Sequence, residues 1–424
     1  MIEKSIYGGA GLARADGKAI FVPFTLPGES IEAEITNDRG SYAEAELTGI
    51  LDPSPSRVAP PCGYFGACGG CHYQHASYAR QLEIKKQILQ ETLERAHLSA
   101  VPEIALLAAE PFHYRNRARF HLDRATSALC FKKRASHTNL PVDACPISAA
   151  VLEESMRVIN ANRGRWRLAK HFDEVELFTN AEQSSLLLTL WTRANSVTAK
   201  AALDELWPLI KATLGHVEGA AVFSVERGNQ HSRMLASAGS PSLQYLVAGQ
   251  NYRVSIGSFF QVNRSMIGPL VDLVTRDAAA TLAWDLYAGV GLFARALLAG
   301  CKEVVAVESA PSSVQDLRHN LSGTGSRIVA STTLDFLRGA RASAKATPDL
   351  VIVDPPRAGL GKEVTALLGE IRPPRITYVS CDPATLSRDL KSLLDSGYSL
   401  QQLHMVDMFP QTFHLESVAM LSVP

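Results

Sequence analysis

The chain has 424 residues, of which 46% are hydrophobic and 20% are charged, and its formal net charge is zero. This length predicts two or three domains, each with its own core. No secretory segment opens the chain and no apolar run is long enough to span a bilayer, which argues against secreted and membrane classes. We therefore expect a cytoplasmic, monomeric protein. Any nucleic-acid partner would be bound by local basic patches rather than by an overall positive field.

Residues 1–55 have the pattern of a small β-barrel. Short alternating runs at 19–22, 31–35 and 42–47 are separated by Asp-Gly and Pro-Gly turn signals. Several short strands in one small segment predict a barrel of the OB type, a common platform for RNA. The Asp-Gly-Lys, Phe-Val-Pro and Pro-Gly-Glu runs also resemble a TRAM domain. A barrel that only packs on its neighbour is the alternative.

A group of cysteines follows this segment. Cys62, Cys68 and Cys71 are separated by glycines, and Cys145, followed by proline, is the candidate fourth member. Glycines let several thiolates converge on one centre without side chains in the way. All-thiolate ligation fits either a 4Fe–4S cluster or a structural zinc. Zinc sites more often use paired Cys-x2-Cys units, so the spacing favours iron–sulfur.

Residues 60–250 are predicted to form a central α+β domain around this cysteine site. An amphipathic helix is expected over 78–98, and it is a candidate to pack on the C-terminal domain. Strand alternation places Arg115, Arg117 and Arg119 on one face. Three like charges on one face need an anionic partner, and we expect RNA phosphates to provide it.

The segment 251–424 alternates strand and helix patterns, which predicts a doubly wound α/β domain of the Rossmann type. An apolar strand leads to Tyr287 and a Gly-Val-Gly turn, and a helix follows, so a cofactor can approach the backbone. Glu308 ends the next strand, where such sheets present a carboxylate to ribose hydroxyls. Ala294 stands at the third glycine position of the dinucleotide motif, so glycine spacing alone leaves NAD open.

Three further positions favour S-adenosylmethionine. Asp335 follows a third predicted strand, near where an adenine would be bound. Asp354 begins an Asp-Pro-Pro-Arg run at a strand end, which is a rigid loop that directs a carboxylate into the cleft. Gln261, in a Phe-Phe-Gln-Val-Asn run, is a weaker candidate for binding a base edge or an amino-acid moiety.

Cys381 lies on a turn between a predicted strand, 376–379, and a helix that begins at Pro383. Open α/β sheets place their chemistry on such turns. The positive end of the helix dipole would favour the thiolate. A buried core cysteine is the alternative for this position taken alone.

Four motifs together resemble the RNA uracil-C5 methyltransferases: Phe-Gln-Val-Asn at Gln261, Asp-Pro-Pro-Arg at Asp354, Ser-Cys-Asp-Pro at Cys381 and Phe-His-Leu-Glu-Ser at Glu416. The branch with a TRAM domain and a four-cysteine iron–sulfur cluster, which methylates 23S rRNA, is the most similar. Related tRNA enzymes keep both features in some branches, so a tRNA substrate stays open. The resemblance implies S-adenosylmethionine at Gln261, Tyr287, Glu308, Asp354 and the less constant Asp335, a 4Fe–4S cluster on Cys62, Cys68, Cys71 and Cys145, Cys381 as nucleophile and Glu416 as base.

The implied chemistry explains these residue types. Carbon 5 of uracil is a weak nucleophile, and addition of the Cys381 thiolate to carbon 6 turns the ring into an enolate that can accept a methyl group. Arg357 is a candidate donor to the charge on O4. Glu416, in an apolar run, is expected to have a raised pKa suited to removing the carbon-5 proton. The target base must leave its stack, and Phe259 or Phe260 could stack against it.

Two other classes remain open. A non-catalytic RNA-binding or assembly factor would keep the fold without its chemistry, which an intact Cys381 and Glu416 argue against. An amino-methyltransferase usually has an aromatic residue after Asp-Pro-Pro, where this chain has Arg357.

Overall fold

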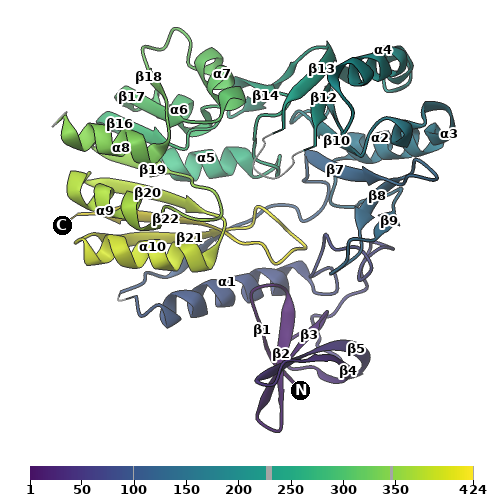
Figure 1. Ribbon diagram of the computed structural model, residues 1–424. Helices are drawn as coiled ribbons and strands as arrows, with labels where there is room; N and C mark the ends of the chain where they lie inside the picture. Colours follow the sequence, from purple (N-terminus) through teal and green to yellow (C-terminus); the bar gives the residue numbers. More distant parts are fainter. Residues whose placement is uncertain (99, 226–231, 344–346, 424) are drawn as a thin grey trace.

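The computed structural model describes residues 1–98, 100–225, 232–343 and 347–423. Within these ranges the strands form four sheets, which follow the chain from an N-terminal module through a central layer to a C-terminal α/β layer (Figure 1). No helix in the same ranges is long and apolar enough to cross a membrane.

The N-terminal module is a five-stranded sheet in the spatial order β1-β2-β3-β5-β4. Gly17 and Gly28 have positive φ angles at its turns, as the Asp-Gly and Pro-Gly pairs predict. The carbonyl of Ile2 accepts the N–H of Gly28 (2.8 Å), and the N–H of Ile2 donates to the carbonyl of Glu29 (2.9 Å). Strand β1 therefore lies beside the segment that leads into β4. The predicted strands are confirmed, and closure into a barrel stays a prediction. The strands are β1 (Ile2–Ser5), β2 (Ala10–Ala15), β3 (Lys18–Pro23), β4 (Ser30–Asp38) and β5 (Tyr42–Asp52).

The central layer is a seven-stranded sheet in the order β13-β12-β11-β10-β7-β8-β9. Helices α2 and α4 pack on one face, where Leu188 and Leu190 belong to the buried cluster. Leu187 faces the other way and belongs to the core of the C-terminal layer, so the two layers share a packed interface. The strands are β7 (Arg117–Leu122), β8 (Leu129–Lys132), β9 (Asn139–Pro141), β10 (Glu174–Thr179), β11 (Leu186–Thr192), β12 (Val217–Ser224) and β13 (Met234–Gly239), and the helices are α2 (Ala150–Ala161), α3 (Arg163–Trp166) and α4 (Ser196–Thr213).

The C-terminal layer is an eight-stranded sheet in the order β18-β17-β16-β19-β20-β22-β21-β6. The strands from β18 to β20 are parallel, and β22 is antiparallel to β20. Helices cover both faces, so the layer is doubly wound, as predicted. The strands are β16 (Ala280–Leu286), β17 (Cys301–Glu308), β18 (Arg327–Ala330), β19 (Leu350–Val353), β20 (Arg375–Ser380), β21 (Ser399–Val406) and β22 (Glu416–Ser422), and the helices are α5 (Ile267–Thr275), α6 (Leu292–Leu297), α7 (Pro311–Asn320), α8 (Thr333–Ala342), α9 (Gly361–Ile371) and α10 (Pro383–Asp395).

Three pieces that lie wholly or partly in the segment 60–250 pack with this C-terminal layer. Strand β6 (Ile104–Leu107) pairs in parallel with β21 and forms the outer edge of the sheet. The hairpin of β14 (Ser242–Val247) and β15 (Gln250–Ser255) adds its apolar side chains to the same core. Helix α1 (Tyr78–Arg95) packs against α10 and β21. A boundary at residue 250 therefore does not coincide with the packing.

Candidate active site

The C-terminal sheet brings five of the predicted site residues to one edge. Parallel strands end there, and the antiparallel β22 begins there. Ligands of open α/β sheets bind at this position. With Gln261, these residues line one cavity of about 640 Å³. The five are Tyr287 after β16, Glu308 at the end of β17, Asp354 after β19, Cys381 after β20 and Glu416 at the start of β22.

The cavity is also lined by aromatic residues to which the sequence patterns assigned no role, or assigned a role without deciding between two neighbours. Phe409 and His414 line it from the loop between β21 and β22. The side chain of Phe259 is 65% exposed, whereas Phe260 is 2% exposed and its ring packs 4.6 Å from that of Tyr245. Of the two aromatic rings considered for stacking on a base, Phe259 is therefore the accessible one.

The turn that carries Cys381 differs electrostatically from the expectation. The carboxylate of Asp382 accepts two N–H groups in the first turn of α10, at 3.0 and 2.9 Å. A carboxylate thus already occupies the helix N-terminus. Burial raises the pKa of the Cys381 thiol to about 12, and the carboxylates of Glu416 and Asp354 act in the same direction. The predicted preference for the thiolate is wrong for the protein alone, so a nearby base or cation must help Cys381 to ionise.

Two buried carboxyl groups share the cavity with Cys381. Glu416 is 3% exposed, and burial raises its pKa well above the ordinary value, with Asp354 adding to the shift and Arg357 opposing it. Burial also raises the pKa of Asp354 to about 7. Carboxyl groups with raised pKa values can exchange protons near neutral pH, as a general base must. The raised pKa predicted for Glu416 is confirmed.

Other residues that line the cavity have the features of a nucleoside site. The Glu308 carboxylate accepts the N–H of Gly289 (2.8 Å) and two further backbone N–H groups at 2.7 Å. No atom lies within 4 Å of the position that a Cβ on Gly289 would take, so the turn leaves open space. Tyr287 has a φ of 65°, a strained conformation that is typical of functional sites. Gln261 donates to Asp354 at 3.5 Å.

Two other acids, Asp335 and Asp285, do not line the cavity. Asp335 is exposed in the first turn of α8, where its carboxylate accepts the Thr332 hydroxyl (2.7 Å), and it is not among the residues that line the cavity. Asp285 was not assigned from the sequence, although it is a lone acid in an apolar strand. It is fully buried, one of its oxygens accepts the N–H of Ala294 (2.8 Å), and the other has no hydrogen-bond partner among the described residues. Burial raises the pKa of Asp285 to about 8.

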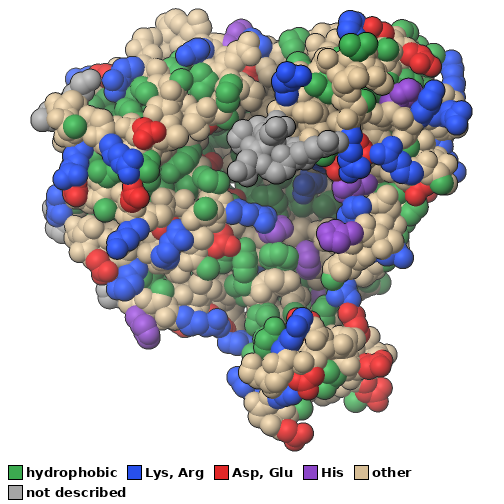
Figure 2. All heavy atoms as spheres, in the orientation of Figure 1, with side chains coloured by type: hydrophobic (Ala, Val, Ile, Leu, Met, Phe, Trp, Pro, Cys, Tyr) green, Lys and Arg blue, Asp and Glu red, His purple; other side chains and the backbone are tan. Residues whose placement is uncertain are grey.

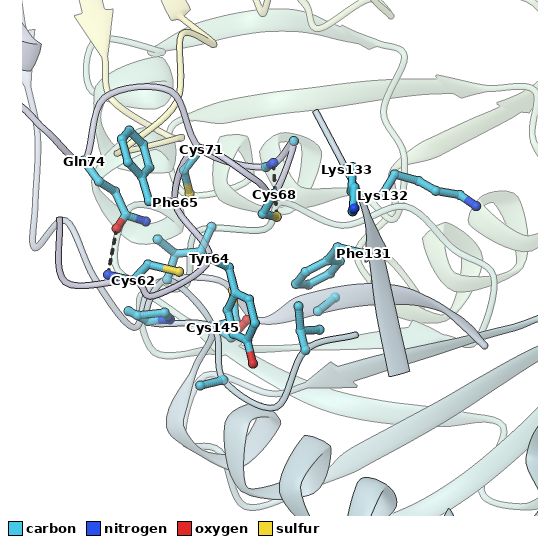
Figure 3. Close-up of a pocket in the computed structure, with 18 of the residues that line it drawn as sticks. Cys62, Tyr64, Phe65, Cys68, Cys71, Gln74, Phe131, Lys132, Lys133 and Cys145 are labelled. Atoms are coloured by element: carbon cyan, nitrogen blue, oxygen red, sulfur yellow. Dashed lines mark hydrogen bonds between the residues drawn. The ribbon is translucent and has the colours of Figure 1, made fainter. Parts of the chain in front are cut away.

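The four candidate cluster cysteines line a second cavity of about 560 Å³, shown in Figure 3. Burial raises the pKa of Cys71 to about 12 and also raises the pKa values of Cys68 and Cys145. Neighbouring thiols act in the same direction on Cys68 and Cys71. A bound cation would reverse these shifts, because it stabilises thiolates. Among the described side chains, no three His, Cys, Asp or Glu residues converge closely enough to hold a single metal ion.

The structure gives two residues of the predicted arginine face partners within the chain. Arg117 lies 4.0 Å above the ring of Phe178, and Arg119 lies 3.7 Å above the ring of Trp191 and pairs with a glutamate of β10. The side chain of Arg117 is only 16% exposed. The alternation was read correctly, but the neighbouring strands supply aromatic and acidic partners. Arg117 is therefore largely covered, whereas the side chain of Arg119 stays 48% exposed, and phosphate binding by this face stays a prediction.

The family model of the tRNA (Uracil-5-)-methyltransferases matches residues 77–423 of the chain, and the family model of the TRAM domain matches residues 2–48. The chain belongs to the tRNA (Uracil-5-)-methyltransferase family. Membership confirms the resemblance drawn from the four motifs and identifies an RNA uracil-C5 methyltransferase with an N-terminal TRAM domain. It also rules against an amino-methyltransferase and an NAD enzyme.

Relatives of this methyltransferase match it over almost its whole length. An uncharacterized RNA methyltransferase of Aquifex aeolicus is 32% identical, covering 100% of this chain and 97% of the relative. The 23S rRNA (uracil(1939)-C(5))-methyltransferase RlmD of Shewanella amazonensis is 32% identical, covering 98% and 93%. The crystal structure of Pyrococcus abyssi tRNA (uracil-54, C5)-methyltransferase with S-adenosyl-L-homocysteine has a TM-score of 0.79 at 22% identity and covers 99% of both chains. The complete fold is therefore shared.

Proposed function

We propose that this methyltransferase acts on a uridine of 23S rRNA, with S-adenosylmethionine as donor and a Cys381–carbon 6 adduct as intermediate. The observation that supports this best is that Cys381, Asp354 and Glu416 share one cavity with the glycine turn. The rRNA substrate is supported by RlmD relatives that are 32% and 31% identical over 98% and 97% of the chain. A tRNA substrate is the second candidate, favoured by the match to the tRNA (Uracil-5-)-methyltransferase family.

The cavity fits the proposed donor. The open space at Gly289 lets a cofactor approach the backbone, and Glu308 is fixed where ribose hydroxyls are bound in this class of sheet. When bound, S-adenosylmethionine supplies an electrophilic methyl group. Around the hollow on the face shown in Figure 2, Lys, Arg and His side chains gather, which suits an RNA strand.

The residues of the chain then have distinct tasks. The sulfur of Cys381 loses its proton and bonds to carbon 6, and the ring π electrons move to carbon 5 and O4. Carbon 5 would take the methyl group of the sulfonium, whose carbon–sulfur bond breaks with both electrons left on the sulfur, so the leaving group is a neutral thioether. Glu416 then accepts the carbon-5 proton, and the electrons of that C–H bond re-form the ring double bond as the sulfur leaves. Arg357 lines the cavity and is placed to oppose negative charge that develops there.

We also propose that Cys62, Cys68, Cys71 and Cys145 hold a 4Fe–4S cluster. Four thiols around one cavity, with no acidic side chain in its lining, suit iron–sulfur ligation. A tetrahedral zinc site would need sulfur atoms within about 4 Å of one another.

RNA with 5-fluorouridine at the target position tests the catalytic proposal. This base has no carbon-5 proton to remove, so a covalent protein–RNA band that survives denaturation should form only when S-adenosylmethionine is present. Glu416→Gln should trap the adduct on ordinary uridine, because addition and methyl transfer precede the step that it loses. Fragments of 23S rRNA and whole tRNA, compared in parallel, decide the substrate. If Cys381→Ala still makes 5-methyluridine, the mechanism is wrong.

A further inference from the structure

The loop between β21 and β22, residues 407–415, contacts the N-terminal module, helix α1 and the cysteine loop, residues 53–77, and we call it the Gln411 loop. It leads directly into Glu416 and contributes Phe409 and His414 to the active-site cavity. Its own conformation is fixed by residues that lie far away in the sequence. The family chemistry assigns none of those residues a role.

Gln411 is held from two sides. Its φ of 68° is left-handed, a conformation that is strained for a non-glycine residue. The carbonyl of Gln411 accepts the N–H groups of His72 (2.8 Å) and Tyr73 (3.0 Å), which directly follow Cys71. Gln81 of α1 donates to the Gln411 side chain (3.0 Å) and accepts from its backbone N–H (3.1 Å). The cysteine loop and α1 thus together maintain a strained backbone.

The start of the loop is held by a buried ion pair. The ammonium of Lys85 lies 2.6 Å from the carboxylate of Asp407, and both side chains are at most 1% exposed. Lys85 also donates to the carbonyl of Phe409 (2.9 Å), and the hydroxyl of Tyr78 donates to Asp407 (2.9 Å). Removing one partner would leave a buried charge unpaired, which is strongly destabilising.

The end of the loop is held by one aromatic ring from the N-terminal module and one from the cysteine loop. The ring centroid of Phe413 lies 5.3 Å from that of Tyr7 and 4.6 Å from that of His72, both in edge-on contacts. Tyr7 belongs to the N-terminal module, and its hydroxyl also donates to Asp382 at 3.3 Å. The N-terminal module therefore touches the residue next to the nucleophile Cys381.

The contacts continue from Phe413 into the cavity. Its ring lies 4.3 Å from that of His414, and Nδ1 of His414 lies 3.4 Å from a guanidinium nitrogen of Arg357. The charge of Arg357 lowers the pKa values of Cys381 and Glu416, against the effect of burial. The titratable and charged groups that act on Cys381 are Glu416, Asp354, Arg357 and Tyr7.

We propose that Tyr7 and Phe413 are positioning residues, which fix the His414–Arg357 contact and the turn at Cys381 for the reaction. This inference rests on the proposed function of Cys381 as nucleophile. It gives the N-terminal module a second task besides binding RNA, namely to form part of the support of the active site. It also links the cysteine loop to the cavity through His72.

Alkylation of Cys381 in the free protein tests the proposal without RNA. The rate with iodoacetamide is measured at several pH values, and the modified cysteine is located by peptide mass spectrometry. Phe413→Ala should slow alkylation of Cys381 at pH 9 by about threefold or more, because displacement of Arg357 disfavours the thiolate. Phe413→Leu, which keeps an apolar side chain of similar reach, should restore most of the rate.

Single-turnover methylation gives the second measurement. Tyr7→Phe should lower the rate of the methylation step about tenfold, because small misplacements of reacting groups have effects of this size, and should leave RNA affinity unchanged. Tyr42→Phe is the matched control, since Tyr42 lies in the same module but its ring packs on Phe21 (5.6 Å). A change in RNA affinity with an unchanged rate would mean that Tyr7 serves binding alone.

The two readouts separate the proposals. Unchanged alkylation and methylation rates in Tyr7→Phe and Phe413→Ala would overturn the positioning role and leave the proposed function standing. A shifted alkylation profile in a protein that methylates neither rRNA nor tRNA would support the positioning role and overturn the function. If Phe413→Ala loses its fold by circular dichroism, Tyr7→Phe decides the outcome, because an unchanged methylation rate in that variant overturns the positioning role.

Discussion

Two cavities of this protein are lined by cysteine, and they place opposite demands on that side chain. At the active site a single thiol, Cys381, lies with the buried carboxyl groups of Asp354 and Glu416. In the other cavity four thiols lie together, with no Asp or Glu in the lining. Burial raises the pKa of Cys381 and of Cys71 to about 12 in both places.

The comparison shows that burial alone does not define the function of a cysteine. Beside carboxyl groups, a thiol has groups at hand that can accept its proton, so it can cycle between bound and free states during a reaction. Beside other thiols, it has no such acceptor, and only a cation makes ionisation of the whole set favourable. The neighbouring groups, rather than the shared burial, distinguish the proposed nucleophile Cys381 from the proposed cluster ligands.

The largest expected effect separates the two cavities by substitution. Cys381→Ala should lower methylation by about 10⁴-fold or more, because loss of a nucleophile removes the chemical step. Its iron content should equal that of the wild type. A variant that loses iron as well as activity would show that the cavities are not independent.

The next largest effect is expected from a substitution in the cavity that is lined by four cysteines. Cys145→Ser should lower the iron content of anaerobically purified protein, expected at about four atoms per chain with equal sulfide, and should lower the melting temperature. Cys130→Ser is the matched control, since Cys130 is buried but lies outside that cavity. Colourless wild-type protein with stoichiometric zinc would contradict the cluster assignment.

The pH dependence of the reaction gives a smaller, graded effect. Because the pKa of Cys381 is raised to about 12, most of the thiol is protonated at neutral pH. Single-turnover methylation should therefore rise with pH between about 6 and 9, by up to about tenfold per unit. A flat profile over that range would mean that ionisation of Cys381 does not limit the reaction.

The smallest expected effect concerns a buried carboxyl group that lines neither cavity. Asp285 has a folded-state pKa of about 8, well above the unfolded value of about 4. The protonated group favours the fold at low pH, and this contribution is lost as the pH rises from about 4 to about 8. Stability of Asp285→Asn, measured by urea unfolding, should fall less with pH than that of the wild type, by at most about 1.4 kcal/mol per unit. Exposed Asp335→Asn should follow the wild type.

The sequence predicted those site residues that follow directly from local patterns. Glu308, Asp354 and Cys381 come at the ends of apolar runs, and parallel strands must bring such ends to one edge. Glu416 could be placed only through the family resemblance, because it opens an antiparallel strand.

What could not be predicted depends on partners far away in the chain. Arg117 and Arg119 alternate as expected, but nothing local shows that Phe178 and Trp191 lie beneath them. The helix after Cys381 was recognised, but not that Asp382 would take its N-terminus. The end of the Gln411 loop carries part of the Phe-His-Leu-Glu-Ser motif, but no local pattern shows the conformation of the loop, which is set by contacts with α1 and the cysteine loop.

Strand β6 has a consequence for how the chain is made. Strand β6 is synthesised long before β21, the strand with which it pairs. The C-terminal sheet is therefore completed by a strand that stays unpaired during most of translation. A fragment that begins after residue 108 would leave β21 with an open row of hydrogen-bonding groups, which is a site for aggregation. The catalytic layer therefore cannot be exchanged between proteins as a single C-terminal block, because a transplant must carry the early strand with it.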